Sequence, residues 1–161
     1  MTTSDEKQLV GHLSLVETAQ IVDYLRRLFL VGFEAAALLV DFADGSPGAS
    51  NVRVAISTAS RSLAEAAFAL EALFPATTPP LEFLAVEVPE LPYGAKSREI
   101  SLFLKSEILN VGLEKLAEVQ RRGSYFQDAN LLSFASYARL ALTECVELLD
   151  GVAKIGTRAL H

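Results

Sequence analysis

The sequence is poor in the residues that hold metals and act as nucleophiles. It contains one cysteine, Cys145, and two histidines, His12 and His161, among 161 residues, and it has no tryptophan. A single thiol excludes an intrachain disulfide framework and any zinc or iron–sulfur site made of several cysteines. Neither histidine follows a glutamate at the Glu-x-x-His spacing of di-iron bundles. We therefore expect no metal and no cofactor, and we identify no catalytic residue, which makes an enzyme the less favoured class.

Positive charge and long hydrophobic runs are also scarce. The chain has 14 Lys and Arg against 20 Asp and Glu, and its net charge of −6 argues against nucleic acid as a partner. The longest apolar stretch, residues 28–40, is interrupted by Glu34 and is shorter than the ~20 residues that cross a bilayer. The N-terminus lacks the basic start and apolar block of a secretory signal. We expect a cytoplasmic protein with no membrane partner.

Leucine and alanine dominate what is present, which is a helix-forming composition. Hydrophobic residues make up 51% of the chain, and the mean hydropathy of +0.32 is high for a water-soluble domain. We predict an all-α chain that forms a single helical-bundle domain over residues 1–161. Because this much apolar surface is most simply covered by another copy, we also expect a homo-oligomer.

Glycine and proline divide the chain into four segments with helical periodicity. These segments cover residues 14–43, residues 51–74, residues 97–122, and the chain from 124 onward. The pattern predicts an antiparallel four-helix bundle with a long Pro-containing connection, about residues 75–96, between the second and third helices. This connection is too apolar for a disordered tether, and we expect it to bury Leu81, Phe83, Val86 and Leu91.

Local signals predict where these helices begin and end. Ser14 with Glu17, and Ser124 with Gln127, have the spacing of capping boxes and predict two helix starts. Other signals of the same kind are Asn51 as an N-cap, Pro75 as a helix stop, Gly123 as a helix end, and a short separate helix over residues 5–10.

Two segments show a seam of apolar residues with spacings of three and four, which is typical of closely packed helices. In the second segment the seam comprises Val52, Ile56, Ala59, Leu63, Ala66, Leu70 and Leu73. The seam of the fourth segment contains Cys145. We therefore interpret this thiol as a core residue, with a catalytic nucleophile as the less favoured alternative.

The first segment has a narrow polar line on an otherwise apolar helix. The line is formed by Gln20, Arg27, Glu34 and Asp41, which recur every seven residues. A helix with so few polar residues is expected to be buried around most of its circumference, within its own bundle or against another chain. For a subunit contact we predict Phe29, Phe33 and Val40. Glu34 is interpreted as exposed on the polar line, with a buried functional carboxylate as the alternative.

Lys96, Ser97 and Arg98 stand at the predicted start of the third helix. Free amide groups and two basic side chains at a helix N-terminus favour an anion, so these residues are a candidate anion-binding site. The alternative is that Ser97 caps the helix between ordinary exposed basic residues.

The sequence as a whole favours a non-enzymatic protein that acts through self-association and protein–protein interaction, as a scaffold, adaptor or small chaperone. The alternative is a sensor or carrier that binds a small apolar ligand between its helices.

Overall fold

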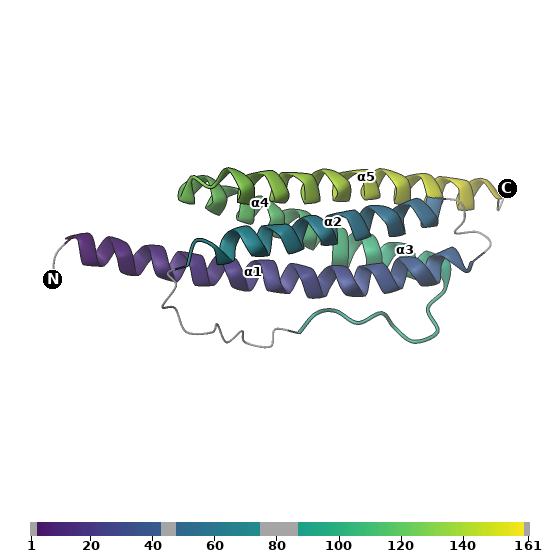
Figure 1. Cartoon of the computed structure of the whole chain (residues 1–161). Coiled ribbons are helices and arrows are strands. Elements are labelled where there is room, and N and C mark those ends of the chain that lie inside the picture. The colour runs from purple at the N-terminus through teal and green to yellow at the C-terminus, as the bar shows by residue number, and fades with distance from the viewer. Residues whose placement is uncertain (1–2, 43–47, 75–86, 160–161) are drawn as a thin grey trace.

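The computed structural model describes residues 3–42, 48–74 and 87–159, and within these ranges every regular element is helical (Figure 1). The elements are α1 (Thr3–Val40), α2 (Gly48–Glu71), α3 (Ser97–Phe103), the π-helix η1 (Leu104–Leu109), α4 (Asn110–Phe126) and α5 (Ala129–Ala159). Since α3, η1 and α4 follow one another without a break, the described part of the chain forms four helical rods. The prediction of an all-α bundle is confirmed.

The four rods occupy the corners of a square. Helix α1 contacts α2 and α4, and helix α5 contacts the same two helices from the other side. Within the described ranges the Cα atoms of α1 lie more than 8 Å from those of α5, and the same holds for α2 and α4. Each rod therefore packs against two neighbours, and part of its circumference faces away from the bundle.

The contacts between α1 and the third rod (α3, η1 and α4) show that these two rods run in opposite directions. Gly32 lies against Ile108, Phe29 lies against Gly112, and Ser14 accepts a hydrogen bond from Arg122. Figure 1 also shows α2 and the third rod running in the same direction, opposite to α1 and α5.

The long connection follows from these directions. Helix α2 has 24 residues and is therefore about 36 Å long, a distance that the chain must cover again before α3 starts. In the described part of this connection, residues 87–96, Leu91 and Ala95 pack against the core. The predicted burial of Leu81, Phe83 and Val86 falls outside the described residues.

The predicted core seams are largely confirmed. In α2 the residues Val52, Ile56, Ala59, Leu63, Ala66 and Leu70 are buried, and Leu73 is half-buried just beyond the helix. In α5 the predicted residues Leu131, Ala138, Ala141 and Cys145 are buried, Phe134 and Leu148 are half-buried, and Leu149 is buried although the predicted seam did not include it.

The predicted starts of the first two helices are wrong. Helix α1 begins at Thr3 and continues through residues 5–11, so Ser14 and Glu17 lie inside it and form no capping box. The carbonyl group of Ser14 and the carboxylate of Glu17 instead accept hydrogen bonds from a neighbouring helix. Helix α2 begins at Gly48, which places Asn51 in its first turns rather than at the cap. Helix α2 ends at Glu71, and Pro75 lies outside the described residues.

The predicted boundary at Gly123 is also wrong. Helix α4 continues to Phe126 and ends where Gln127 adopts a left-handed conformation, with φ of 55°. The amide of Asp128 donates to the Gly123 carbonyl group at 3.2 Å, and the amide of Gln127 donates to the Ser124 carbonyl group at 3.1 Å. This pair of bonds is a Schellman motif, which satisfies carbonyl groups at the helix end.

The residue that caps α5 is Asp128 and not Ser124. Its Oδ1 atom accepts a hydrogen bond of 2.7 Å from the amide of Leu131. Gly123 is buried, and a Cβ atom there would lie 3.4 Å from atoms of Leu131 and Leu132. This is an ordinary van der Waals distance, so the packing of α4 against α5 does not require a glycine at this position.

The third rod contains a feature that helical periodicity did not predict. Residues 104–109 form a π-helix, and Leu104, Ile108 and Leu109 within it are buried. Across from this segment, a Cβ atom at Gly32 would lie 2.7 Å from the Cγ2 atom of Ile108. The glycine leaves the room that α1 and the π-helix need to approach one another.

Candidate interaction surface on helix α1

One flank of α1 faces away from the bundle and carries large apolar side chains. Leu30, Phe33 and Leu38 expose 60%, 37% and 48% of their surface. Leu28, on the opposite side of the same helix, is fully buried, and so is Phe29, which lies next to Phe33 at the border between the exposed flank and the core. We call the exposed flank, which comprises Asp23, Arg26, Arg27, Leu30, Phe33, Glu34, Ala37, Leu38 and Asp41, the outward face of α1.

In the single chain one flank of α1 is left in solvent, so α1 is not buried all round within its own bundle, and the alternative expectation, burial of this flank against another chain, stays a prediction. Arg26, Glu34 and Asp41 on this face are exposed. Asp23 and Arg27 form an ion pair of 3.2 Å between Oδ2 and Nη2, with each side chain about a third exposed. The face therefore carries Leu30, Phe33 and Leu38 around the exposed Glu34, with further charged residues toward both ends.

Of the residues predicted for a subunit contact, Phe33 lies on the outward face. Phe29 is fully buried, and a Cβ atom at Gly112 would lie 2.8 Å from its ring, so this phenylalanine belongs to the core. Val40, the last residue of α1, is half-buried and packs against the core. The structure therefore does not bring the three residues together on one surface.

Sequence reasoning missed Leu30 and Leu38. Both lie four residues from Glu34, one before it and one after it, and residues four apart share a helix face. Both leucines are exposed together with Glu34. The interpretation of Glu34 as an exposed residue is confirmed, and its position was the signal that identified this face.

The edge of the outward face next to α2 is fixed by a cation–π contact. The guanidinium carbon of Arg53, an exposed residue of α2, lies 5.8 Å from the centroid of the Phe33 ring. Such contacts at exposed sites contribute about 0.5–1 kcal/mol. Phe33 is therefore held at the border between the two helices.

Cys145 lies in the core, as predicted. Its side chain is fully buried, and its Sγ atom donates to the carbonyl oxygen of Val52 across a distance of 3.8 Å. Burial, followed by the negative charge of Glu144, raises the pKa of the Cys145 thiol to about 12. At neutral pH the thiol is protonated, which makes it inert as a nucleophile or metal ligand.

Lys96, Ser97 and Arg98 are spread around the start of α3. Lys96 is the residue that precedes the first turn, and its side chain makes no capping hydrogen bond. Lys96 and Arg98 are exposed and Ser97 is half-buried. Helix α3 has seven residues and continues directly into the π-helix. The anion-binding site at these three residues stays a prediction.

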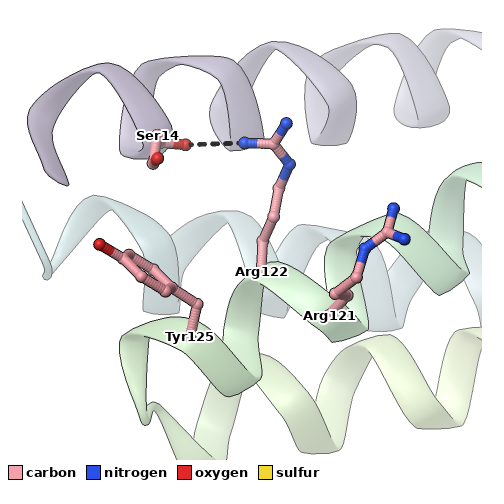
Figure 2. Close-up of a pocket in the computed structure, with 4 residues that line it drawn as sticks. All are labelled: Ser14, Arg121, Arg122 and Tyr125. Atoms are coloured by element: carbon pink, nitrogen blue, oxygen red, sulfur yellow. Dashed lines mark hydrogen bonds between the residues drawn. The ribbon is translucent and has the colours of Figure 1, made fainter. Parts of the chain in front are cut away.

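An arginine cluster that the sequence did not reveal joins α1 to α4 near the α4–α5 turn (Figure 2). Arg122 donates from Nη2 to Glu17 at 3.0 Å and from Nε to Glu118 at 2.9 Å, and its Nη1 atom lies 3.5 Å from the Ser14 carbonyl oxygen. Arg121 pairs with Glu118.

This cluster borders a cavity of about 230 Å³ lined by Ser14, Arg121, Arg122 and Tyr125. Figure 2 shows Arg122 reaching from α4 to the Ser14 carbonyl group, with Arg121 and Tyr125 on either side of it. Two arginines and two glutamates leave no net charge in the cluster, and Arg122 is already engaged by three acceptors. We interpret it as a clamp between the helices.

Two wider searches of the described residues give no further site. No group of three or more histidine, cysteine, aspartate or glutamate side chains is placed to hold a metal ion there. Among the helices of the described ranges, none is long and apolar enough to span a bilayer. Comparison with models of protein families, with curated proteins and with solved structures found no match to the chain.

Proposed function

We propose that this protein is a non-enzymatic cytoplasmic helical bundle that acts through self-association and protein–protein interaction, as a scaffold, adaptor or small chaperone. The observation that supports the proposal is the outward face of α1, where Leu30, Phe33 and Leu38 are exposed within nine residues of one helix. Single apolar residues on a surface are ordinary, whereas a group of them rimmed by charge is typical of a contact surface.

Association relieves the cost of keeping this surface in water. Burying apolar area contributes roughly 25 cal/mol per Å², and the three side chains lie together on a rigid helix, so little conformational entropy is lost when they become covered. The charged residues Arg26 and Asp41 flank them, and Glu34 lies among them. Charges at the rim of a contact keep the free chain soluble and favour one orientation of the partner.

The alternative function, a carrier of a small apolar ligand between the helices, has no comparable support. The positions at the centre of the bundle are filled by fully buried side chains, including Leu25, Leu63 and Leu116. The cavity next to Arg122 is bordered by ion-paired side chains and lies near the end of the bundle.

The experiment that tests self-association compares two leucines of equal exposure on two different helices. Leu30 on α1 is 60% exposed and Leu140 on α5 is 59% exposed. We expect sedimentation equilibrium to show an oligomer for the wild type and for Leu140→Glu, and a folded monomer for Leu30→Glu. Phe33→Glu is expected to dissociate the oligomer in the same way while circular dichroism shows an unchanged helix content.

Two results would contradict the proposal in different ways. A wild-type chain that is monomeric at every accessible concentration removes self-association. An oligomer that Leu140→Glu disrupts and Leu30→Glu does not would move the contact from α1 to α5.

A further inference from the structure

The polar line of α1 runs through its outward face, because Glu34 lies between Leu30 and Leu38 along the helix surface. Gln20, Arg27, Glu34 and Asp41 are seven residues apart, which is almost two full turns, so they lie nearly in a row. Gln20 and Arg27 are half-buried, and Glu34 and Asp41 are exposed. Along the row the side chains are therefore an amide, a cation and two anions.

When two copies of this row are placed side by side in opposite directions, the charges of one copy are complementary to those of the other. Two helices related by a two-fold axis perpendicular to both run in opposite directions, so a row of residues in the contact on one helix meets the same row in reverse order on the other. If Arg27 lies opposite Glu34 of the second copy, then Glu34 lies opposite the second Arg27. In the same register, Gln20 lies opposite Asp41 and can donate its amide hydrogens to that carboxylate.

A parallel contact in register has the opposite property. It places Arg27 against Arg27 and Glu34 against Glu34, and like charges that meet at a contact repel one another. A parallel contact shifted by seven residues pairs unlike charges but leaves one end of each copy uncovered, so it continues into an open chain.

The same register also brings the apolar residues together. Its midpoint falls between Leu30 and Val31, so the two copies of Leu30 meet at the two-fold axis. Phe33, three residues further on, lies beside the Leu30 side chain of the other copy. The most exposed leucine of the outward face thus becomes the most central residue of the contact.

We propose that the outward face of α1 binds the same face of a second copy in an antiparallel, two-fold arrangement in which Arg27 pairs with the partner's Glu34. The proposal rests on the proposed function, since it assumes that the chain self-associates, and it names the partner and the register. Within each copy, Arg27 keeps its contact with Asp23, 3.2 Å away, which holds the guanidinium group on the face.

Charge reversal tests the pairing. We expect Arg27→Glu and Glu34→Arg each to weaken the dimer about tenfold, because each creates two like-charge pairs. The double variant Arg27→Glu/Glu34→Arg restores unlike charges and should return the dissociation constant to within about threefold of the wild type. Glu147→Arg is the control, since Glu147 is exposed on α5, whose Cα atoms lie more than 8 Å from those of α1 within the described residues. Dissociation constants come from sedimentation equilibrium, and denaturant unfolding checks each variant for its fold.

Cysteine cross-linking tests the direction independently of charge. In the antiparallel register, Leu30→Cys places two thiols at the two-fold axis, where a disulfide bond can form. Leu38→Cys places them about 22 Å apart along the helix axes, because 15 residues separate them at 1.5 Å each. We expect oxidation to cross-link the first variant and not the second. The native Cys145 is fully buried and does not interfere.

The outcomes separate this proposal from the proposed function. A wild-type dimer in which both cysteine variants cross-link equally, or in which the double charge reversal fails to restore binding, overturns the antiparallel register and leaves self-association intact. A wild-type chain that stays monomeric overturns both.

Discussion

Helices α1 and α5 lie diagonally across the bundle from one another, and their solvent-facing sides carry different kinds of residue. Both bury one side completely against α2 and α4. The outward side of α1 exposes Leu30, Phe33 and Leu38, whereas that of α5 exposes Leu140 among polar and charged residues: Ser133, Ser136, Tyr137, Thr143, Glu144 and Glu147. In a square of four helices each rod has only two neighbours, so an outward side exists whatever residues occupy it. The apolar character of α1 therefore does not imply burial in its own chain.

The largest expected effect concerns the sides of α1 and α5 that meet in the core. A Cβ atom at Gly112 would lie 2.8 Å from the Phe29 ring of α1 and 3.0 Å from Leu142 of α5. We expect Phe29→Ala to lower the free energy of unfolding by about 3–5 kcal/mol and Leu142→Ala by about 2–5 kcal/mol, because each leaves a cavity. Phe33→Ala, four residues from Phe29, should cost less than about 1 kcal/mol. Urea unfolding at low protein concentration measures all three, and equal losses for the two phenylalanines would refute the assignment of Phe33 to an outward face.

The second effect is a pH dependence of the unfolding free energy that arises from Cys145 on α5. The pKa of Cys145 is raised from 9.0 to about 12, so above pH 9 the unfolded chain loses the thiol proton while the folded chain keeps it. The stability that this protonated thiol contributes is present below pH 9 and is lost as the pH rises toward 12, at about 1.4 kcal/mol per pH unit. Cys145→Ala removes this contribution. The difference in unfolding free energy between wild type and variant should therefore change between pH 8 and 10, and a constant difference would contradict a buried thiol.

A smaller effect concerns the N-terminal half of α1, which the Arg122 clamp joins to α4. Arg122→Ala removes hydrogen bonds to Glu17 and Glu118, and we expect a loss of about 1 kcal/mol in unfolding free energy. Arg121 is the matched control, since its side chain is 75% exposed and makes one ion pair, so Arg121→Ala should change stability by less than about 0.5 kcal/mol. Hydrogen exchange should show faster amide opening around residues 14–18 in the Arg122 variant, and no such change would mean that the clamp is not needed there.

The smallest effect is expected on the outward sides themselves. Leu30→Ser and Leu140→Ser should each change the unfolding free energy of the monomer by less than about 0.5 kcal/mol, because neither side chain is buried in the chain. The two variants should differ in oligomeric state, since we expect only Leu30→Ser, the substitution on α1, to weaken association. Equal effects of the two substitutions on sedimentation would remove the distinction between the helices.

The helices and their core seams could be predicted because periodicity is a local property. The seam from Val52 to Leu70 and the burial of Cys145 followed from spacings within single helices, and the structure confirms both. Helix ends were predicted less well. Gly123 resembles a helix end in the sequence, but α4 continues past it to Phe126 and ends at the left-handed Gln127.

The candidate site was predicted only in part, because the sequence does not show which side of α1 the neighbouring helices pack against. Phe29 and Phe33 are four residues apart and chemically identical, yet one is in the core and the other is on the surface. The π-helix and the two glycines Gly32 and Gly112, which allow close approach to α1, are likewise visible only when the helices are placed together.

The sequence by itself determined that this chain is helical, which residues form the seam of α2, and that its single thiol is buried. Only the tertiary structure decided which flank of α1 faces solvent and that Arg122 reaches Ser14, 108 residues away in the chain. The physical reason is that a helix forms from hydrogen bonds and side-chain spacings among near neighbours in the sequence. Its exposed side is instead whatever surface remains after two other helices have packed against it.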